Sequence, residues 1–278
     1  YGTWAASYPD GPAVVNSITG RGYVFLSGES KARWLRPWVK LFYRRVLRRP
    51  RCELIFENEA DQQYFLQEKL ASREHAWLVR SVGVDVERFC PQPEREGKPV
   101  VLRASRMLWD KGAGVFVEAA RLLRERNLAR FALCGAPDPG NPASIPEETL
   151  RGWAEEGAVE WWGFKADMPQ VYASASIVCL PTTYGEGVPT VLIEAAASGR
   201  ALVGSDTPGC REVIQPEVNG LLVPPDNAPA LAAALERLVV DGALRRRMGM
   251  AARQSAVERF SARQVHAETW AIYHRALR

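Results

Sequence analysis

Two stretches of the sequence hold charged side chains in loops that would join a strand to a helix. The first reads SRMLWDKG at residues 105–112, and in it Arg106 and Lys111 lie five positions apart. Two cations at this spacing could clamp a diphosphate, because one cation about 4 Å from one phosphate charge gains about 4 kcal/mol at an effective dielectric constant of about 20. The alternative is a solvated loop whose cations are ordinary surface residues.

The second stretch reads TYGEGVPT at residues 183–190 and leads into a predicted helix over 189–197 that carries Glu194. Pro189 suits the first position of a helix, and the free N–H groups at a helix start form an anion site. Glu186 and Glu194 could accept hydrogen bonds from the vicinal hydroxyl groups of a sugar or a ribose. The alternative is that Glu186 only caps the helix and Glu194 is a paired acid at the edge of the core.

The elements around these loops follow the pattern of βαβ units, in which short apolar runs alternate with helical periodicity. Ligands of doubly wound sheets bind at the carboxyl ends of the strands, where both loops fall. We expect strands at 13–17, 54–57, 76–79, 100–104, 131–135, 159–161, 177–181, 201–205 and 221–223. We expect helices at 59–69, 115–126, 146–156, 168–173, 189–197, 229–240, 243–257 and 262–277.

A domain boundary is predicted at PQPEREGKP, residues 91–99, whose prolines and charges resist both helix and strand. Residues 1–97 would form the first domain and residues 98–262 the second. The closing helix at 263–278 is expected to pack back on the first domain.

Composition narrows the class of protein. Five cysteines without a C-x-x-C pair argue against a disulfide framework or a zinc site and favour a reducing compartment, and no apolar run is long enough to span a bilayer. The formal net charge of +4 comes from residues 1–99, which hold 16 Lys and Arg against 12 Asp and Glu. No helix-turn-helix, zinc-finger or RNA-binding signature accompanies these cations, so nucleic acid is not an expected partner.

Together these motifs resemble the donor-binding half of glycosyltransferase family 4, whose members are retaining enzymes of the GT-B fold. The resemblance rests on ASRMLWDKG (104–112) and EGVPTVLIE (186–194), with GVDVERF (83–89) and NGLLVP (219–224) in support. It implies an α/β chain with a doubly wound, Rossmann-like donor domain and an incomplete Rossmann-like acceptor domain. The amino-terminal part of the acceptor domain, with its usual histidine near the reacting sugar, is expected to precede Tyr1. His75, His266 and His274 do not replace that histidine, so the activity of the chain alone stays open.

The resemblance also implies roles for individual residues. Arg106 and Lys111 would bind the donor diphosphate, and Glu186 would contact the transferred sugar, which makes these three the predicted catalytic residues. The predicted donor-binding residues are Phe164 at the base, Gly187, Val188 and Thr190 at sugar and phosphate oxygens, and Glu194 at the ribose. The donor is expected to be a UDP-sugar.

The sequence contains no D-x-D motif, which binds the metal ion in the other large glycosyltransferase fold. The resemblance therefore implies that no metal and no cofactor are needed. Two other functions stay open. One is a fragment that binds a nucleotide-sugar without transferring it. The other is a nucleotide-sugar 2-epimerase of the same fold, against which the E-x7-E pattern beside Arg106 and Lys111 argues.

The basic segment 31–51 contains nine cations and no acid. As a helix it would place Trp34, Trp38, Phe42, Leu35 and Val46 on one face, with Arg33, Arg36, Lys40 and Arg44 opposite. Such a helix could lie in a membrane interface, or it could pack on the acceptor domain with its cations snorkelling outward. The predicted membrane contacts are Lys31, Trp34, Trp38, Arg44, Arg45 and Arg48.

We therefore expect a cytoplasmic protein held peripherally at an anionic membrane surface, on the inner face of the cytoplasmic membrane. The segments DPGNP (138–142) and EWWG (160–163) extend the resemblance to enzymes that act on polyprenyl-diphosphate-linked saccharides. That acceptor class would belong to surface polysaccharide or glycoprotein glycan synthesis.

Overall fold

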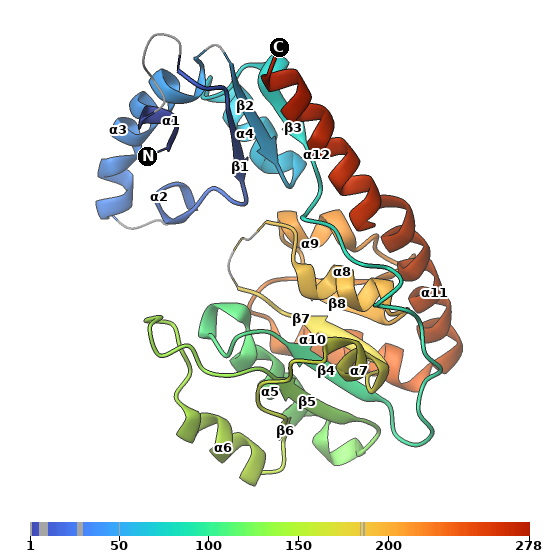
Figure 1. Cartoon of the computed structure of the whole chain (residues 1–278). Helices are drawn as coiled ribbons and strands as arrows, with labels where there is room; N and C mark the ends of the chain where they lie inside the picture. Colours follow the sequence, from blue (N-terminus) through green and yellow to red (C-terminus); the bar gives the residue numbers. More distant parts are fainter. Residues whose placement is uncertain (1, 6–10, 27–29, 50, 184, 186) are drawn as a thin grey trace. The chain divides into compact units, whose positions relative to one another are not determined.

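The computed structural model describes residues 2–5, 11–26, 30–49, 51–183, 185 and 187–278 (Figure 1). The chain forms two compact units. The first unit comprises residues 1–83, 185–188 and 262–278, and the second unit comprises residues 84–184 and 189–261.

The second unit is built on a six-stranded parallel sheet with the strand order β6-β5-β4-β7-β8-β9. Every residue of β4, β7 and β8 is buried, which explains the nearly continuous apolar runs in these strands. From β4 the chain continues to β5 and β6 on one side and then returns to β7 on the other side of β4. The loops after β4 and β7 therefore diverge and leave room for a ligand. The strands are β4 (Val100–Ala104), β5 (Arg130–Cys134), β6 (Glu160–Trp161), β7 (Ile177–Leu180), β8 (Ala201–Ser205) and β9 (Gly220–Val223).

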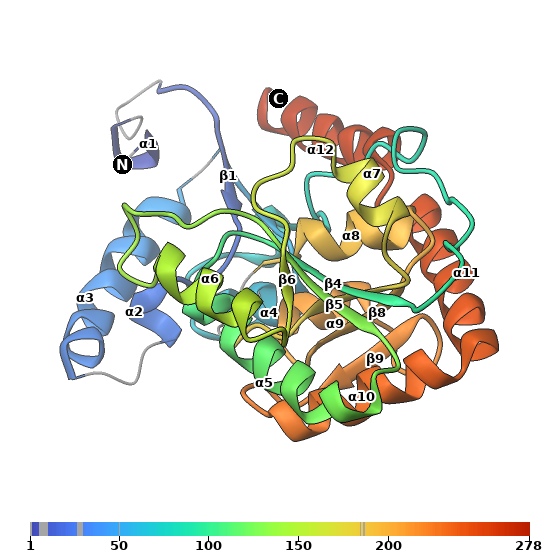
Figure 2. The same cartoon turned by 90° about the horizontal axis from the view of Figure 1, so that it is seen from below.

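Helices cover both faces of this sheet. Figure 2 shows α5 and α10 on one side and α7 and α8 on the other. On the α5 side, Phe116 and Leu235 pack with Leu133 and Val203 in the main hydrophobic core. The helices are α5 (Ala113–Leu123), α6 (Glu147–Glu155), α7 (Met168–Ala173), α8 (Thr190–Ala197), α9 (Pro208–Val213), α10 (Ala228–Val240) and α11 (Gly242–Arg259), with 3-10 turns at Trp109–Lys111 and Arg124–Arg126.

The first unit contains a three-stranded parallel sheet, β1 (Val14–Ile18), β2 (Cys52–Phe56) and β3 (Ala76–Leu78), in that order. Side chains alternate along β2, so Leu54 and Phe56 pack with α3 (Ser30–Leu47) and α4 (Glu59–Gln67). Ile55 faces the opposite way and packs with Val265 and Ile272 of α12 (Ala262–Ala276). The unit also contains α1 (Gly2–Ala5), α2 (Tyr23–Leu26) and a 3-10 turn at Arg73–His75.

The connecting segment 84–97 belongs to the second unit, although the sequence placed its boundary at residue 97. Arg253 explains this difference, because its Nη1 donates to the carbonyl oxygens of Val86 and Phe89 at 2.9 Å each. The Arg245 guanidinium also forms an ion pair with Glu94 at 2.7 Å. Composition marks where helix and strand stop, but it does not show which surface the chain then follows.

The basic helix α3 differs from its predicted arrangement of faces. Arg36 and Arg44, two cations of the predicted opposite face, donate to the carbonyl oxygens of Val24 and Glu68 at 3.0 Å each, and Arg44 remains exposed. Lys40 pairs with the Glu68 carboxylate at 2.8 Å, and Val46 is buried. One exposed side of α3 carries Lys31, Trp34, Trp38, Leu41, Phe42 and Arg45, and the exposed Arg48 follows the helix directly. In the part of the chain that the structure describes, no helix is long and apolar enough to cross a membrane.

Candidate functional site

A cavity of about 500 Å³ lies in the second unit at the carboxyl ends of β4 and β5. Four segments supply its wall: the residues that end and follow β4, the loop after β5, the segment around α7, and α8. The lining residues are Ala104, Ser105, Arg106, Cys134, Gly135, Ala136, Pro137, Asp138, Pro139, Phe164, Lys165, Met168, Tyr172, Val191 and Glu194. A cavity at this end of a doubly wound sheet is where such folds bind nucleotides.

Arg106 provides positive charge at the cavity wall. Its Nη1 pairs with Asp138 Oδ2 at 2.7 Å, and the two side chains are 62% and 33% exposed. A pair this exposed contributes at most about 1 kcal/mol to stability, so an incoming anion can displace Asp138 from Arg106 at little cost. Asp138 is itself held in place, because its backbone N–H donates to Ser144 Oγ at 2.9 Å.

A buried cation supports the loop that carries Arg106. Arg103 on β4 is fully buried, and its Nη2 donates to the carbonyl oxygen of Lys111 at 3.1 Å. Gly112 closes the loop with φ of +72°, and a Cβ at this position would overlap the carbonyl group of Pro181. Only glycine fits both the left-handed conformation and this close approach.

Glu194 lies on α8 at another part of the cavity wall, where Tyr172 fixes its carboxyl group. The buried Tyr172 hydroxyl donates to Glu194 Oε2 at 2.8 Å. Burial raises the pKa of Glu194, while the hydrogen bond from Tyr172 and the charge of Arg88 act to lower it. Burial also raises the pKa of Tyr172 well above its ordinary value, so this hydroxyl stays a proton donor. The carboxyl group is therefore oriented before any ligand binds.

The structure brings together three of the predicted donor-site residues, since Arg106, Phe164 and Glu194 all line this cavity. Phe164 is 74% exposed, so its ring is accessible to a flat partner. Lys111 ends the 3-10 turn Trp109–Lys111 and does not line the cavity, and Thr190 is exposed at the start of α8.

The remaining predicted residues of the glycine-rich loop lie elsewhere. Glu186 falls outside the described residues. Gly187 and Val188 belong to the first unit, where the Val188 N–H donates to Glu57 Oε2 at 3.1 Å. The sequence predicted that the Val188 N–H would meet a sugar or phosphate oxygen, but in the structure it donates to Glu57 instead. Burial raises the pKa of Glu57.

Sequence reasoning missed Tyr172, Asp138 and Arg103. Of these three, only Arg103 has a local sequence feature that could have indicated it, because it is a lone cation within the apolar run VVLRA. Tyr172 and Asp138 gain their roles through contacts with Glu194 and Arg106, which are 22 and 32 positions away in the chain.

Comparison with known proteins identifies the family. The family model described as glycosyl transferases group 1 matches residues 98–241, which contain all six strands of the second unit and the cavity at their carboxyl ends. The chain belongs to the group 1 glycosyl transferases.

This glycosyltransferase chain resembles curated bacterial enzymes over most of its length. It is 29% identical to N,N'-diacetylbacillosaminyl-diphospho-undecaprenol alpha-1,3-N-acetylgalactosaminyltransferase of Campylobacter jejuni, an alignment that covers 93% of this chain and 69% of the relative. It is 30% identical to MMP alpha-(1->4)-mannosyltransferase of Mycolicibacterium hassiacum, over 88% of this chain and 60% of that enzyme.

The fold is shared with solved glycosyltransferase structures. The Anabaena protein Alr3699/HepE, crystallised in complex with UDP, superimposes with a TM-score of 0.79 at 23% identity, over 97% of this chain and 75% of that one. The GT-B fold expected from the sequence is thereby confirmed, as is membership of a family of hexosyltransferases.

Proposed function

We propose that this chain binds a UDP-sugar in the cavity at the carboxyl ends of β4 and β5 and serves a retaining transfer of the sugar. The observation that carries the proposal is the placement around one cavity of an accessible cation, Arg106, and an oriented carboxyl group, Glu194. A cation suits the diphosphate, a fixed carboxyl group suits the two hydroxyls of a ribose, and the exposed Phe164 lies beside them for the base. The complex of Alr3699/HepE with UDP supports this choice of nucleotide.

The chemistry assigned to the site is charge stabilisation on the leaving diphosphate. As the glycosidic bond breaks, negative charge grows on the phosphate oxygens, and Arg106 stabilises that charge once the phosphate has displaced Asp138. Lys111 would assist from the same loop, and Glu186 would bind the transferred sugar. Because side-chain cations do this work, we propose that the reaction needs neither a divalent metal ion nor a cofactor.

Calorimetric titration of the whole chain with UDP, UDP-sugars and GDP-sugars tests the donor assignment. We expect UDP to bind, and Glu194→Gln to weaken the binding of UDP more than that of 2′,3′-dideoxyuridine diphosphate, which lacks the ribose hydroxyls. A folded sample that binds neither nucleotide class contradicts the assignment. Transfer that survives EDTA and keeps the anomeric configuration supports the metal-free, retaining reaction, whereas a strict magnesium requirement or an inverted product contradicts it.

For the acceptor we propose a polyprenyl-diphosphate-linked saccharide. The support is the resemblance to the Campylobacter jejuni enzyme, whose name specifies such a lipid-linked substrate, over 93% of this chain. Incubation with a radiolabelled UDP-sugar and an undecaprenyl-diphosphate-linked saccharide should move label into the organic phase. Free labelled sugar without any lipid product would instead favour the epimerase, and a bound donor that yields neither product would favour a fragment that only binds it.

We further propose that the exposed side of α3 meets an anionic membrane, at the inner face of the cytoplasmic membrane. Trp34 and Trp38 are 70% and 63% exposed, and Leu41 and Phe42 are 47% and 44% exposed. Lys31 and Arg45 are exposed on the same side of the helix, and the exposed Arg48 follows its last residue, Leu47. An exposed face that mixes tryptophans with cations suits the headgroup region of a bilayer, where each cation contributes about 1 kcal/mol.

Co-sedimentation with vesicles tests this surface. Arg45→Gln with Arg48→Gln should weaken binding to vesicles that contain anionic lipid, and the loss should shrink at 1 M salt because screening shortens to about 3 Å. Arg246→Gln with Arg247→Gln, on the exposed side of α11, removes the same charge and is the matched control. Equal sedimentation of the two double variants contradicts the proposal.

A further inference from the structure

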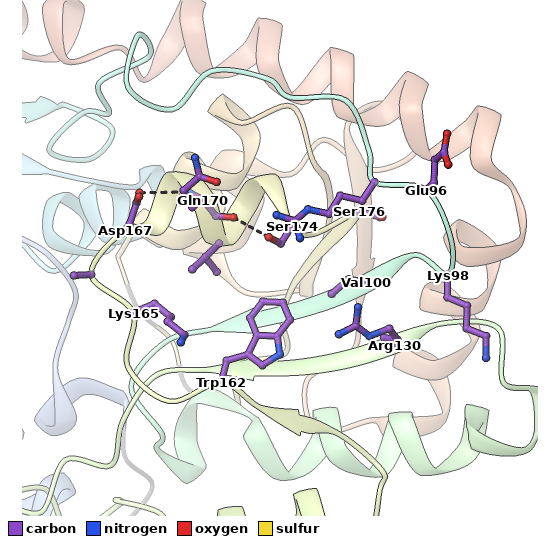
Figure 3. A pocket seen from close by; sticks show the side chains of 13 residues that line it. Glu96, Lys98, Val100, Arg130, Trp162, Lys165, Asp167, Gln170, Ser174 and Ser176 are labelled. Carbon is purple, nitrogen blue, oxygen red and sulfur yellow. Dashed lines mark hydrogen bonds between the residues drawn. The ribbon is translucent and has the colours of Figure 1, made fainter.

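A second cavity, of about 630 Å³, lies in the second unit beside α7 and extends to the amino ends of β4 and β5. Its wall includes Val100 and Arg130, the first residues of β4 and β5, and also the loop 162–167 and α7 (Figure 3). The helix beside the cavity, α7, has only six residues. The donor cavity, by contrast, lies at the carboxyl ends of the same strands.

One wall of this cavity is a fixed aromatic platform. The carboxylate of Glu160 accepts a hydrogen bond from Trp162 Nε1 at 2.9 Å and two from the Arg130 guanidinium, at 2.7 and 2.8 Å. The hydrogen bonds from Arg130 lower the pKa of Glu160, so the carboxylate stays charged and holds both side chains in place. Figure 3 shows the Trp162 ring between Lys165 and Arg130.

The rim of the cavity carries cations that have no other task. Arg95 and Lys165 make no hydrogen bond or ion pair with any residue that the structure describes, and Arg130 uses only Nε and Nη2 on Glu160. Of the two acids on the rim, Asp167 is engaged as the cap of α7, where its side chain accepts from the Gln170 N–H at 3.4 Å. The lining holds the cations Arg95, Lys98, Arg130 and Lys165 against the acids Glu96 and Asp167, and even when Glu160 is counted against Arg130 the excess charge is positive.

We propose that this cavity binds an anionic sugar, a hexose that carries a phosphate or a carboxylate. The apolar face of a sugar ring presents C–H groups of positive partial charge, which suit the negative face of the fixed Trp162 ring. Arg95, Lys165 and the Nη1 group of Arg130 then meet the anionic group through charge-assisted hydrogen bonds. The proposal does not depend on the donor assignment, because of the residues named here only Lys165 also lines the donor cavity.

Calorimetric titration of the whole chain with glucose 1-phosphate and with glucuronate tests this site, with methyl glucoside and inorganic phosphate as controls. We expect an anionic hexose to bind at least about tenfold more tightly than either control. Trp162→Leu should weaken that binding about tenfold and Arg95→Gln several-fold. The comparison of glucose 1-phosphate with glucuronate shows which anionic group the cations prefer.

Glu194→Gln is the control variant, because it alters the donor cavity and should leave the binding of the anionic hexose unchanged. The proposal is overturned if neither anionic hexose binds at about 10 mM, or if Trp162→Leu and Arg95→Gln, both with an unchanged melting temperature, bind as the parent does. It is also overturned if Glu194→Gln abolishes binding, since the sugar phosphate would then occupy the donor cavity. Failure of UDP to bind, with glucose 1-phosphate still bound, refutes only the donor assignment.

Discussion

Tyr172→Phe tests whether a buried hydroxyl prepares Glu194 for the donor. Phenylalanine keeps the aromatic ring and lacks only the hydroxyl oxygen, so the change mainly removes the 2.8 Å hydrogen bond to Glu194 Oε2. A hydrogen bond to a charged group contributes about 1.5–3 kcal/mol. Glu194 is only partly buried, so water can replace the lost donor, and we expect the free energy of unfolding to fall by about 1.5 kcal/mol, the lower end of this range.

The effect of Tyr172→Phe on the donor should depend on the ribose hydroxyls. Without Tyr172 the carboxyl group of Glu194 turns freely, and we expect UDP to bind about tenfold more weakly while 2′,3′-dideoxyuridine diphosphate is unaffected. Calorimetry on Tyr172→Phe, Glu194→Gln and the double variant forms a cycle that measures their coupling. Tyr273→Phe, on the exposed side of α12, is the matched control. Equal losses for both nucleotides, or fully additive effects of the two substitutions, would refute the reasoning.

Three further predictions concern stability. Burial raises the pKa of Glu194, so ionisation of this carboxyl group destabilises the folded state as pH rises from the ordinary pKa of Glu toward the raised one. Glu194→Gln should therefore raise the free energy of unfolding at pH 7 but not below about pH 4. An equal gain at both pH values in urea titrations would contradict this. Gly112→Ala should cost more than about 2 kcal/mol in the same titrations, whereas Gly152→Ala in α6, where a Cβ meets nothing, should stabilise by up to about 1 kcal/mol. Asn58→Ala removes the amino-terminal cap of α4, whose side chain accepts a hydrogen bond from the Asp61 N–H at 2.8 Å. The melting temperature should fall by an amount equivalent to about 1–2 kcal/mol. An unchanged melting temperature would show that the cap contributes nothing.

Much of the second unit could be predicted because its strands are buried on both faces. The apolar runs at β4 and β8 begin and end as predicted, since Val100–Ala104 and Ala201–Ser205 are buried throughout. The short helix α9 (Pro208–Val213) was missed, whereas α7, which is equally short, was predicted over the residues that form it, 168–173. The course of residues 84–97 was also missed, since it depends on Arg253 and Arg245, which follow more than a hundred positions later.

The donor cavity was predictable in part for the same reason. Arg106 and Glu194 lie in motifs that follow strands, and the topology of a doubly wound sheet brings such loops to one edge. The orientation of Glu194 by Tyr172 depends on a contact that no local pattern encodes. The hydrogen bond from the Val188 N–H to Glu57 likewise joins residues 131 positions apart. The motif alone therefore could not show that this backbone donor is already occupied in the fold.

Arg103 has a consequence for the thermodynamics of binding. The buried guanidinium of Arg103 donates a hydrogen bond to the Lys111 carbonyl oxygen. The backbone of the 105–112 loop is therefore ordered during folding rather than when a nucleotide-sugar binds. Fixing one residue of backbone costs about 1–2 kcal/mol of conformational entropy, so a loop left free would subtract several kcal/mol from the affinity for the diphosphate. Arg103, which is fully buried and does not line the cavity, would thus affect how much of the interaction energy proposed for Arg106 appears as binding.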